Sequence, residues 1–427
     1  MRTTRHLAAI ISLTVLGASP ALGSGLSISE HSAAATGMAG AVGAVANDPS
    51  AGFYNPAGLA TQTGLGIEAS FTAFIAAAAY KGIAPGTATE VQVDAPQNFY
   101  LPSGHVAYRI HDRVAAGFSL YFPFGLGAAW PDTVDVNGTE TPYWGRGGMK
   151  SLTLYTMFLN PNVAVKLHDR LYIGGGPTIV KGVVTLGRPL TLTSNIADDI
   201  DMKLSGEGWA VGGNVGVLVK VLPDVLNVGA TYRSKVDLTF KGDAAFTRDG
   251  SPDNVPTTLR TLALDGPAEA DLPLPHVISF HIAAFPIKPL TIGFGFDFST
   301  WSGYERLNIR FPDNPALAVS EPKDWNNTVT VRVGAEYRIL PELPVRAGFI
   351  FDQGPVPAVT LGPDAPDSDR YEATVGVGYV FKGFRLDVAY QFFTTAFADT
   401  APGAPYDGAY RMRFHIASAT LGYNLDI

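Results

Sequence analysis

The chain of 427 residues contains no cysteine and little charge. Without cysteine it can use neither disulfide bonds nor thiol chemistry, so its stability must come from backbone pairing and side-chain packing. Charged residues make up only 16% of the chain, compared with roughly 25% in typical soluble domains. Hydrophobic residues reach 46%. This composition favours a protein in contact with lipid.

Positive charge and catalytic motifs are also scarce. The 30 Lys and Arg residues are outnumbered by 38 Asp and Glu residues, and no basic cluster occurs, so a nucleic-acid partner is excluded. The sequence has no Gly-x-Ser-x-Gly, no His-Glu-x-x-His, no phosphate-binding loop and no clustered metal ligands. We therefore expect no catalytic residues, no metal and no cofactor. An enzymatic function, as an outer-membrane hydrolase, is the weaker alternative to this non-enzymatic interpretation.

Long hydrophobic runs are confined to the first 23 residues. Arg2 and Arg5 precede an apolar stretch at 7–17, and the small residues at 21–23 offer a cleavage site before Ser24. This pattern is typical of a secretory signal peptide, and the apolar stretch is too short for a spanning helix, which needs about 20 residues. After residue 23 no stretch approaches 18 apolar residues, so the mature chain has no predicted transmembrane helix.

Apolar residues instead alternate with polar or small ones. In the segment 384–392 every even position is apolar, while the odd positions carry Arg, Asp and Gln. The segments 290–298, 329–339, 371–381 and 209–221 behave in the same way. A period of two residues, with one apolar and one polar face, indicates β-strands.

The spacing of the strands distinguishes a membrane barrel from a soluble β-sandwich. We predict fourteen strands, near 65–80, 98–110, 114–122, 151–167, 171–184, 207–221, 225–241, 272–285, 289–300, 326–339, 344–352, 370–381, 384–396 and 411–427. Six short turns alternate with seven long connections, at 81–97, 123–150, 185–206, 242–271, 301–325, 353–369 and 397–410. Outer-membrane barrels are built this way, with short periplasmic turns, long outer loops and an even strand number. The sequence therefore predicts an all-β, transmembrane antiparallel barrel over residues 64–427.

The C-terminal strand carries apolar residues at alternate positions up to Ile427. These residues resemble the signal that the barrel assembly machinery reads, although that signal usually ends in Phe or Trp. Phe414 and Ile416 have the opposite parity from Leu421 and Leu425, which predicts a β-bulge near 418–420.

Residues 24–63 do not alternate. They are rich in Ala, Ser and Gly, and form either a flexible periplasmic tail or a hatch folded inside the barrel. Eight strands leave an interior that side chains fill, whereas sixteen or more leave an open channel. Fourteen strands would leave a considerable lumen, which favours the hatch.

Several motifs carry a family resemblance. The run 32–40 and the segment from Ala46 through Asn55, Pro56 and Ala57 to Leu59 look like the start of the FadL family of outer-membrane transporters for long-chain fatty acids and aromatic hydrocarbons. The segment 121–126 after the third strand also resembles the family, and the layout of hatch, strands and long loops extends this over the mature chain. The Asn-Pro-Ala triplet is the family's most recognisable mark.

The resemblance implies passive uptake of a hydrophobic molecule. In the family, a groove in the outer loops captures the ligand, and a kink in the third strand lets it leave sideways into the membrane. Pro123, Phe124 and Gly125 are the candidates for that wall break, since Pro123 cannot donate a ladder hydrogen bond.

A long outer loop is the candidate for ligand capture. Trp130, Tyr143 and Trp144 give the loop 123–150 an unusual apolar load. A self-packed loop or an interfacial aromatic girdle explains these residues equally well.

Four arginines are predicted to face the lumen: Arg332, Arg338, Arg346 and Arg385. They either form internal ion pairs or include one residue that binds a ligand carboxylate. The expected partners are a hydrophobic small molecule, outer-membrane lipid and the barrel assembly machinery, with the chain acting as a monomer. The closer rival function is a general aqueous porin, whose open lumen would give a high single-channel conductance.

Overall fold

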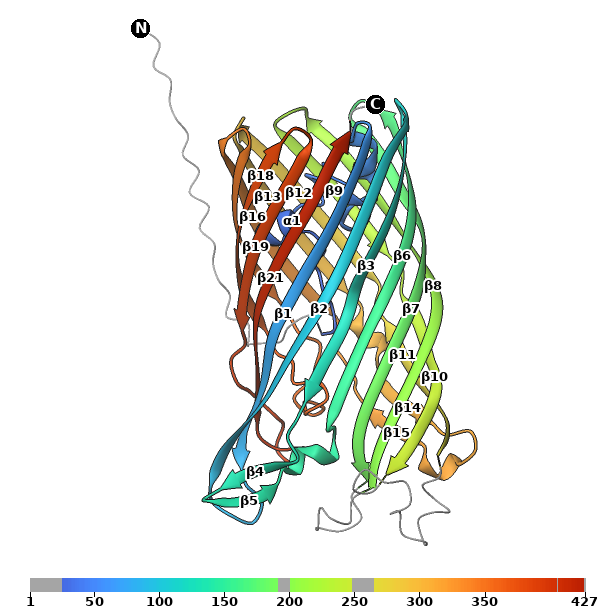
Figure 1. The fold of residues 1–427 in the computed structure, drawn as a ribbon, viewed down its shortest axis with the longest axis vertical. Helices are drawn as coiled ribbons and strands as arrows, with labels where there is room; N and C mark the ends of the chain where they lie inside the picture. The colour runs from blue at the N-terminus through green and yellow to red at the C-terminus, as the bar shows by residue number, and fades with distance from the viewer. Residues whose placement is uncertain (1–24, 191–199, 248–264, 405, 426–427) are drawn as a thin grey trace.

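The computed structural model describes residues 25–190, 200–247, 265–404 and 406–425, and the predicted signal peptide at 1–23 lies outside them. These residues form a closed antiparallel barrel of fourteen strands, as the sequence predicted (Figure 1). The barrel closes because β1 pairs with β2 on one side and with the last strand, β21, on the other. No helix of these residues is long and apolar enough to cross a membrane.

Twelve of the fourteen barrel strands are continuous, and each of the other two consists of two successive segments. The segmented positions are β9 (Leu226–Arg233) with β10 (Val236–Thr247), and β11 (Gly266–Leu274) with β12 (Val277–Ile287). The single strands are β1 (Leu65–Ile83), β2 (Glu90–His111), β3 (Val114–Ala129), β6 (Ser151–His168), β7 (Leu171–Leu190), β8 (Ile200–Leu222), β13 (Leu290–Ser299), β16 (Thr328–Leu340), β17 (Leu343–Asp352), β18 (Arg370–Phe381), β19 (Phe384–Thr394) and β21 (Ala409–Leu425).

The connections contain small elements of their own. These are β4 (Thr133–Val136), β5 (Thr139–Pro142), β14 (Arg306–Arg310), β15 (Val319–Pro322), β20 (Ala398–Asp399), and the 3₁₀ turns η2 (Trp144–Gly147), η5 (Trp301–Gly303) and η6 (Pro315–Leu317). Most of them lie at the long-loop end of the barrel, opposite the C-terminus (Figure 1).

The alternation of the sequence appears as two faces of each strand. On β1, Ile67, Phe71 and Ile75 point outward and are 43%, 52% and 54% exposed, whereas Glu68 and Thr72 point into the lumen and are buried. Large apolar side chains exposed around a closed barrel need hydrocarbon to cover them. The wall is therefore built to stand in a lipid bilayer.

The strands are longer than predicted at the long-loop end. Residues 81–97, expected to be a loop, are mostly strand, because β1 runs to Ile83 and β2 starts at Glu90. There the pattern is reversed: Glu90, Gln92 and Asp94 point outward, and the valines between them point inward. A search for outward-facing apolar residues misses such a segment. The connections predicted at 185–206 and 242–271 likewise lose residues at both ends to strands.

The predicted bulge in the last strand is wrong. β21 pairs with β1 without a register shift from Leu425, opposite Leu65, to Ala409, opposite Lys81. Phe414 and Ile416 face the lumen, where Ile416 is only 2% exposed. Their parity indicated a bulge only if apolar residues always face outward. Here the lumen is apolar as well, so these two residues face inward in a regular strand.

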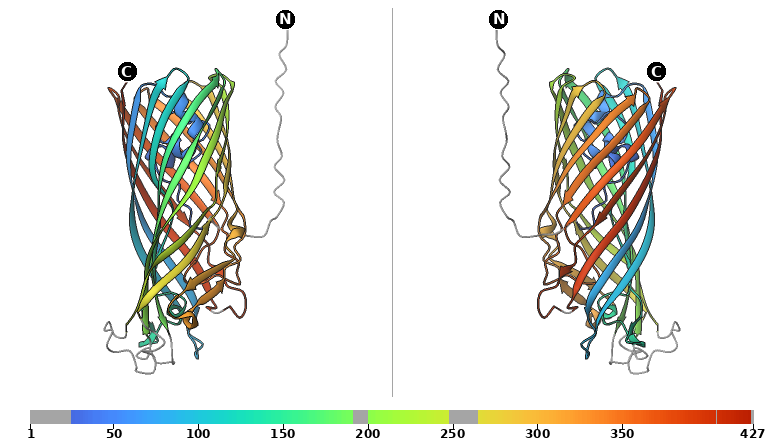
Figure 2. Two further views of the ribbon diagram at one scale, coloured as in Figure 1. Left: turned by 90° about the vertical axis from the view of Figure 1, so that its right-hand side faces the viewer. Right: turned by 90° about the vertical axis from the view of Figure 1, so that its left-hand side faces the viewer.

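Residues 25–63 fold inside the barrel, and both side views in Figure 2 show this hatch enclosed by the strands. It contains α1 (Ala33–Gly37), α2 (Ala51–Tyr54) and η1 (Pro56–Thr61). Where its backbone rests on the wall, the wall residue is often glycine, because a Cβ there would collide with the hatch. This holds for Gly174, Gly229, Gly293, Gly334 and Gly376, which lie on five different strands. At Gly216 on β8 a Cβ would instead meet the Asn55 side chain.

Candidate functional site

The Asn-Pro-Ala triplet anchors the hatch to the wall. The buried Asn55 side chain accepts a hydrogen bond from the Ala57 N–H (3.2 Å), as N-cap residues do. Its amide group donates to the carbonyl of Gly43 (2.7 Å) and to that of Val217 on β8 (3.1 Å). Pro56 occupies the first turn of η1, where no backbone donor is needed. One side chain thus joins two parts of the hatch to the barrel.

Three of the four predicted arginines belong to one ion-pair network on the short-turn side of the hatch. Arg385 contacts Asp48 of the hatch (3.0 Å) and Glu68 of the wall (2.8 Å). Arg346 extends the network through Asp387 (2.6 Å). Arg338 joins it at the short-turn end through Glu336 (3.1 Å), which also contacts Arg346.

The electrostatics of this network hold the hatch in place. Burial by itself would raise the pKa of Asp48, but Arg385 lowers it below its usual value. The carboxylate therefore stays charged within the lumen and pairs with the wall. Ion pairing that fixes the hatch was one of the two interpretations of these arginines.

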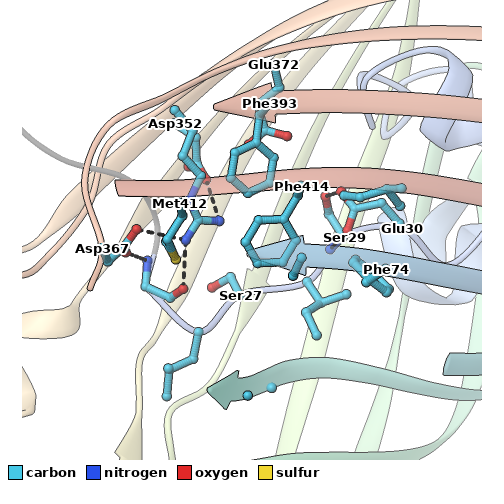
Figure 3. Close-up of a pocket in the computed structure, with 18 of the residues that line it drawn as sticks. Ser27, Ser29, Glu30, Phe74, Asp352, Asp367, Glu372, Phe393, Met412 and Phe414 are labelled. Atoms are coloured by element: carbon cyan, nitrogen blue, oxygen red, sulfur yellow. Dashed lines mark hydrogen bonds and ion pairs between the residues drawn. The ribbon is translucent and has the colours of Figure 1, made fainter. Parts of the chain in front are cut away.

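On the long-loop side of the hatch, which is downward in Figure 1, lies a cavity that we call the central cavity. Its apolar wall is made by inward-facing residues of neighbouring strands: Phe74, Phe99, Phe393, Met412, Phe414 and Ile416 (Figure 3). The rings of Phe393 and Phe414 stack at 4.6 Å, and those of Phe74 and Phe99 at 4.8 Å. The cavity holds about 1010 Å³ of space free of atoms, part of it open to solvent.

One end of the central cavity is charged. Arg370 contacts Asp367 (3.0 Å) and Asp352 (3.8 Å). The two carboxylates are labelled in Figure 3. Burial raises the pKa of Asp367 to about 6, although Arg370 opposes this. Nearby, the Gln391 amide donates to both Glu30 (3.1 Å) and Glu372.

Two of these residues were not predicted from the sequence, although a signal for them was present. Arg370 and Glu372 share the inward parity of Thr374 on β18. Of the four predicted lumen arginines, only Arg332 lines this cavity, and it is paired with Asp297 (3.0 Å).

The wall has a seam between β2 and β3. Their pairing runs from the short turn only as far as Gly104 opposite Leu120. Beyond that point β2 pairs only with β1, and β3 only with β6. The register of β3 against β6 shifts between Tyr121 and Phe124, so an extra residue is accommodated at Phe122–Pro123. The predicted wall-break residues lie at this shift, and their role in ligand exit stays a prediction.

A short segment of the hatch, residues 25–29, covers the seam from inside, and we call it the strap. The Ile28 N–H donates to the Pro123 carbonyl (2.8 Å), and the Gly125 N–H donates to the Leu26 carbonyl (2.9 Å). The strap also separates the central cavity from a second space, which we call the lower cavity. It is lined by Phe53, Pro123, Phe124, Arg233 and Arg332 among others.

A third space, the outer groove, lies toward the long-loop end. It is lined mainly by apolar residues, including Met149, Leu152, Leu154, Leu204, Phe240 and Leu272. Leu26 of the strap and Trp325 line both the outer groove and the central cavity. The two spaces are therefore neighbours.

The predicted capture-loop aromatics do not line these three spaces. Trp130 and Tyr143 are 4% and 0% exposed, with ring centroids 5.6 Å apart. They pack with Tyr80 and Tyr410, and the Trp144 indole donates to the Tyr80 hydroxyl (3.1 Å). This is the self-packed arrangement, and a role for these residues in capture stays a prediction.

Comparisons with known proteins agree with this architecture. A family model described as outer membrane protein transport protein (OMPP1/FadL/TodX) matches residues 14–425. The long-chain fatty acid transport protein of Escherichia coli K12 is 24% identical over 327 residues, covering 69% of this chain and 70% of that protein.

Solved structures show the same fold. A FadL homologue of Pseudomonas aeruginosa has a TM-score of 0.79 at 23% identity, covering 94% of this chain and 99% of the other. The Ralstonia pickettii toluene transporter TbuX has a TM-score of 0.65 at 19% identity, covering 89% and 95%. The members of the matching family are transport channels of the outer membrane rather than enzymes. A plugged, lipid-facing barrel matched by that model over nearly its whole length leads to one assignment: the chain belongs to the OMPP1/FadL/TodX family of outer membrane transport proteins.

Proposed function

We propose that the protein carries hydrophobic molecules passively across the outer membrane and releases them sideways through the seam between β2 and β3. The observation that supports this most directly is the change in the lumen along its height. On β21 the inward residues pass from Thr420 and Ser418 beside the hatch to Ile416, Phe414 and Met412 on its long-loop side. The lumen of an aqueous porin is polar, whereas this apolar stretch suits a cargo that gains by leaving water.

The three spaces form a path for such a cargo. The outer groove and the central cavity share Leu26, and the central and lower cavities share Ile28. The lower cavity is lined by Pro123 and Phe124, which lie just beyond Leu120, the last residue of β3 that pairs with β2. Lateral release into the membrane would keep a hydrophobic molecule out of water. Exposing each of its CH₂ groups to water would cost about 0.8 kcal/mol.

Related proteins indicate the range of cargo. One relative is named for long-chain fatty acids and another structure for toluene. The central cavity combines stacked phenylalanines with a charged end, so we propose an elongated hydrophobic molecule as the cargo.

The remaining features of the proposal concern export and assembly. A cleavable signal peptide over 1–23 would bring the chain to the periplasm, with the short turns facing that compartment and lipid covering the outer face. The barrel closes on itself and leaves no unpaired edge between β1 and β21, which supports a monomer. The outward-facing Leu421 and Leu425 are suited to recognition by the assembly machinery.

A cross-linking experiment tests the lateral exit. The Gln97 side chain lies against Gly127 across the seam. Because the sequence has no native cysteine, a Gln97→Cys, Gly127→Cys pair would be the only target in this protein of a short bis-methanethiosulfonate cross-linker, which joins the two thiols through disulfides with loss of methanesulfinate. Cells lacking their own fatty acid transporter would express this variant, and uptake of radiolabelled oleate would be measured.

Cross-linking should slow uptake several-fold, while each single-cysteine variant treated with the same reagent should transport like the untreated protein. Uptake that is unchanged by the cross-link would reject the lateral exit. Uptake no higher than in cells without the protein would reject hydrophobic transport itself.

A further inference from the structure

Two neighbouring short turns repeat one sequence pattern. The turn between β2 and β3 carries Arg-Ile-His-Asp-Arg at 109–113, and the turn between β6 and β7 carries Lys-Leu-His-Asp-Arg at 166–170. The sequence His-Asp-Arg occurs nowhere else in the chain. The strands β2, β3, β6 and β7 follow one another in the wall (Figure 1), and the Lys166 N–H donates to the Arg113 carbonyl (2.8 Å). The two turns therefore lie side by side.

Both copies of the pattern have the same internal contacts. In each copy the histidine ring accepts from the backbone of the last arginine, through the bonds Arg113 N–H to His111 Nδ1 (3.4 Å) and Arg170 N–H to His168 Nδ1 (3.3 Å). In each copy the first basic residue pairs with the aspartate, through the ion pairs Arg109–Asp112 (3.6 Å) and Lys166–Asp169 (2.9 Å). The pattern is thus a structural repeat as well as a sequence repeat.

The last arginine of each copy is left over. Arg113 and Arg170 are exposed, and no carboxylate among the described residues forms an ion pair with either of them. Four basic side chains against two aspartates give the two turns a net charge of +2 with both histidines neutral, whereas the whole chain carries −8. A negatively charged protein thus has a positive patch at this end of β2, β3, β6 and β7.

The aliphatic residue of each copy fixes the depth of the patch in the membrane. Ile110 and Leu167 point outward, are 58% and 55% exposed, and end the outward apolar rows that include Tyr108 and Val163. Hydrocarbon has to cover these rows. The polar headgroup region begins where the hydrocarbon ends, and the charged residues follow within one or two positions. The patch therefore lies at the level of the lipid headgroups.

The chemistry of the patch suits a phosphate group. A guanidinium presents paired N–H donors that match two phosphate oxygens, and these contacts are charge-assisted. Only residues 112–113 and 169–170 lie between the strands, so Arg113 and Arg170 remain at the membrane surface. Basic side chains at this level attract anionic lipid headgroups. A lipid phosphate therefore fits better than a soluble anion that binds away from the membrane.

We propose that the two turns bind the phosphate groups of phospholipids in the periplasmic leaflet of the outer membrane. This inference rests on the orientation given in the proposed function, in which the short turns face the periplasm. Arg113 and Arg170 contact the phosphate oxygens, while Ile110 and Leu167 lie among the acyl chains. The patch includes the strands on both sides of the seam, so the bound lipids hold both of these strands at a fixed depth.

Native mass spectrometry of the purified protein in detergent tests this site. The protein would be titrated near neutral pH with a phosphatidylglycerol, and separately with a diacylglycerol that has the same acyl chains and no phosphate. The double variant Arg113→Gln, Arg170→Gln removes both arginines. The matched control is Lys288→Gln, Lys382→Gln, which removes two exposed positive charges from other short turns at the same end of the barrel.

The unaltered protein should bind phosphatidylglycerol more tightly than the diacylglycerol. The arginine double variant should weaken phosphatidylglycerol by about 10- to 30-fold, because each basic residue near anionic headgroups contributes roughly a fivefold factor, and should leave the diacylglycerol within about twofold. Arg113→Lys, Arg170→Lys should retain most of the affinity. Equal affinity of the unaltered protein for the two lipids, or an equal loss in the lysine control, would overturn the headgroup site.

Two further measurements separate this inference from its alternatives. Glycerol 3-phosphate at the same concentration should not displace the lipid, because it lacks the acyl chains that Ile110 and Leu167 contact. Displacement would mean that the turns bind free phosphate esters, and the assignment to lipid would be wrong. Oleate uptake is measured on the same variants, so a failure of the proposed transport is seen independently of the lipid result.

Discussion

The fit between hatch and wall predicts a sharp effect for one added methyl group. Gly174 on β7 faces the Asn-Pro-Ala triplet, and a Cβ placed there would lie 2.5 Å from the Pro56 oxygen, 2.6 Å from its carbonyl carbon and 2.8 Å from the Ala57 nitrogen. All three are backbone atoms, so no side-chain rotation relieves the collision. Gly174→Ala must therefore displace η1 or the strand.

The size of the effect follows from the geometry. Ordinary contacts begin near 3.4 Å, so the backbone must move by about 0.6–0.9 Å. Overpacking a tightly packed site costs about 1–3 kcal/mol. Because the hatch is the smaller body, we expect most of this cost to weaken its seating rather than the barrel. Amide exchange in η1 should then speed up by about 5- to 150-fold.

Hydrogen–deuterium exchange of peptides covering residues 51–61 measures this directly, and single-channel recordings should show a higher ion conductance. Gly104→Ala is the matched control, because its Cβ on β2 would meet only the Glu68 oxygen, at 3.9 Å. If Gly174→Ala exchanges at the same rate as that control, the hatch is not packed against the wall as described.

Two further predictions concern charge. Arg385→Met leaves Asp48 and Glu68 buried without their cation and should lower the free energy of unfolding in urea by about 3–5 kcal/mol, whereas Arg338→Met should change it by less than about 1 kcal/mol. The raised pKa of Asp367, about 6, means that the folded state holds this proton more tightly than the unfolded chain, so its contribution to stability is full below about pH 4 and is lost as the pH rises through 6. Asp367→Asn should flatten that part of the stability profile measured by thermal unfolding from pH 4 to 7, and an unchanged profile would contradict the assignment.

The barrel was predictable because the bilayer imposes a simple rule on the sequence. Where a strand crosses hydrocarbon, outward residues such as Ile67 and Phe71 must be apolar, and the period of two is visible without any tertiary knowledge. The requirement for apolar outward residues applies only to the part of a strand that lies within the membrane. Glu90 and Asp94 on β2 face water, so this part of the wall was predicted as a loop.

The cavity was harder to predict, because its apolar residues point into the lumen and the alternation assumes that apolar residues face the lipid. Phe414 and Ile416 are inward and apolar, which the alternation interprets as a bulge. Arg233 and Arg370 lie at strand ends, where parity is least certain from sequence, and so they were overlooked. Whether an arginine is neutralised depends on residues distant in the chain, such as Asp297 for Arg332, and no local pattern contains that information.

The length of the strands sets where the cargo first meets the protein. At about 3.3 Å per residue and a tilt near 40°, the 23 residues of β8 rise on the order of 55 Å, about twice the ~25 Å apolar band of such barrels. The surplus stands at the long-loop end, where the wall is polar outside and apolar inside. The barrel therefore extends beyond the membrane surface, and its apolar inner face begins outside the bilayer. A molecule that enters there leaves water before it reaches the height of the bilayer. It therefore does not have to cross the polar layer that surrounds the outer part of the barrel.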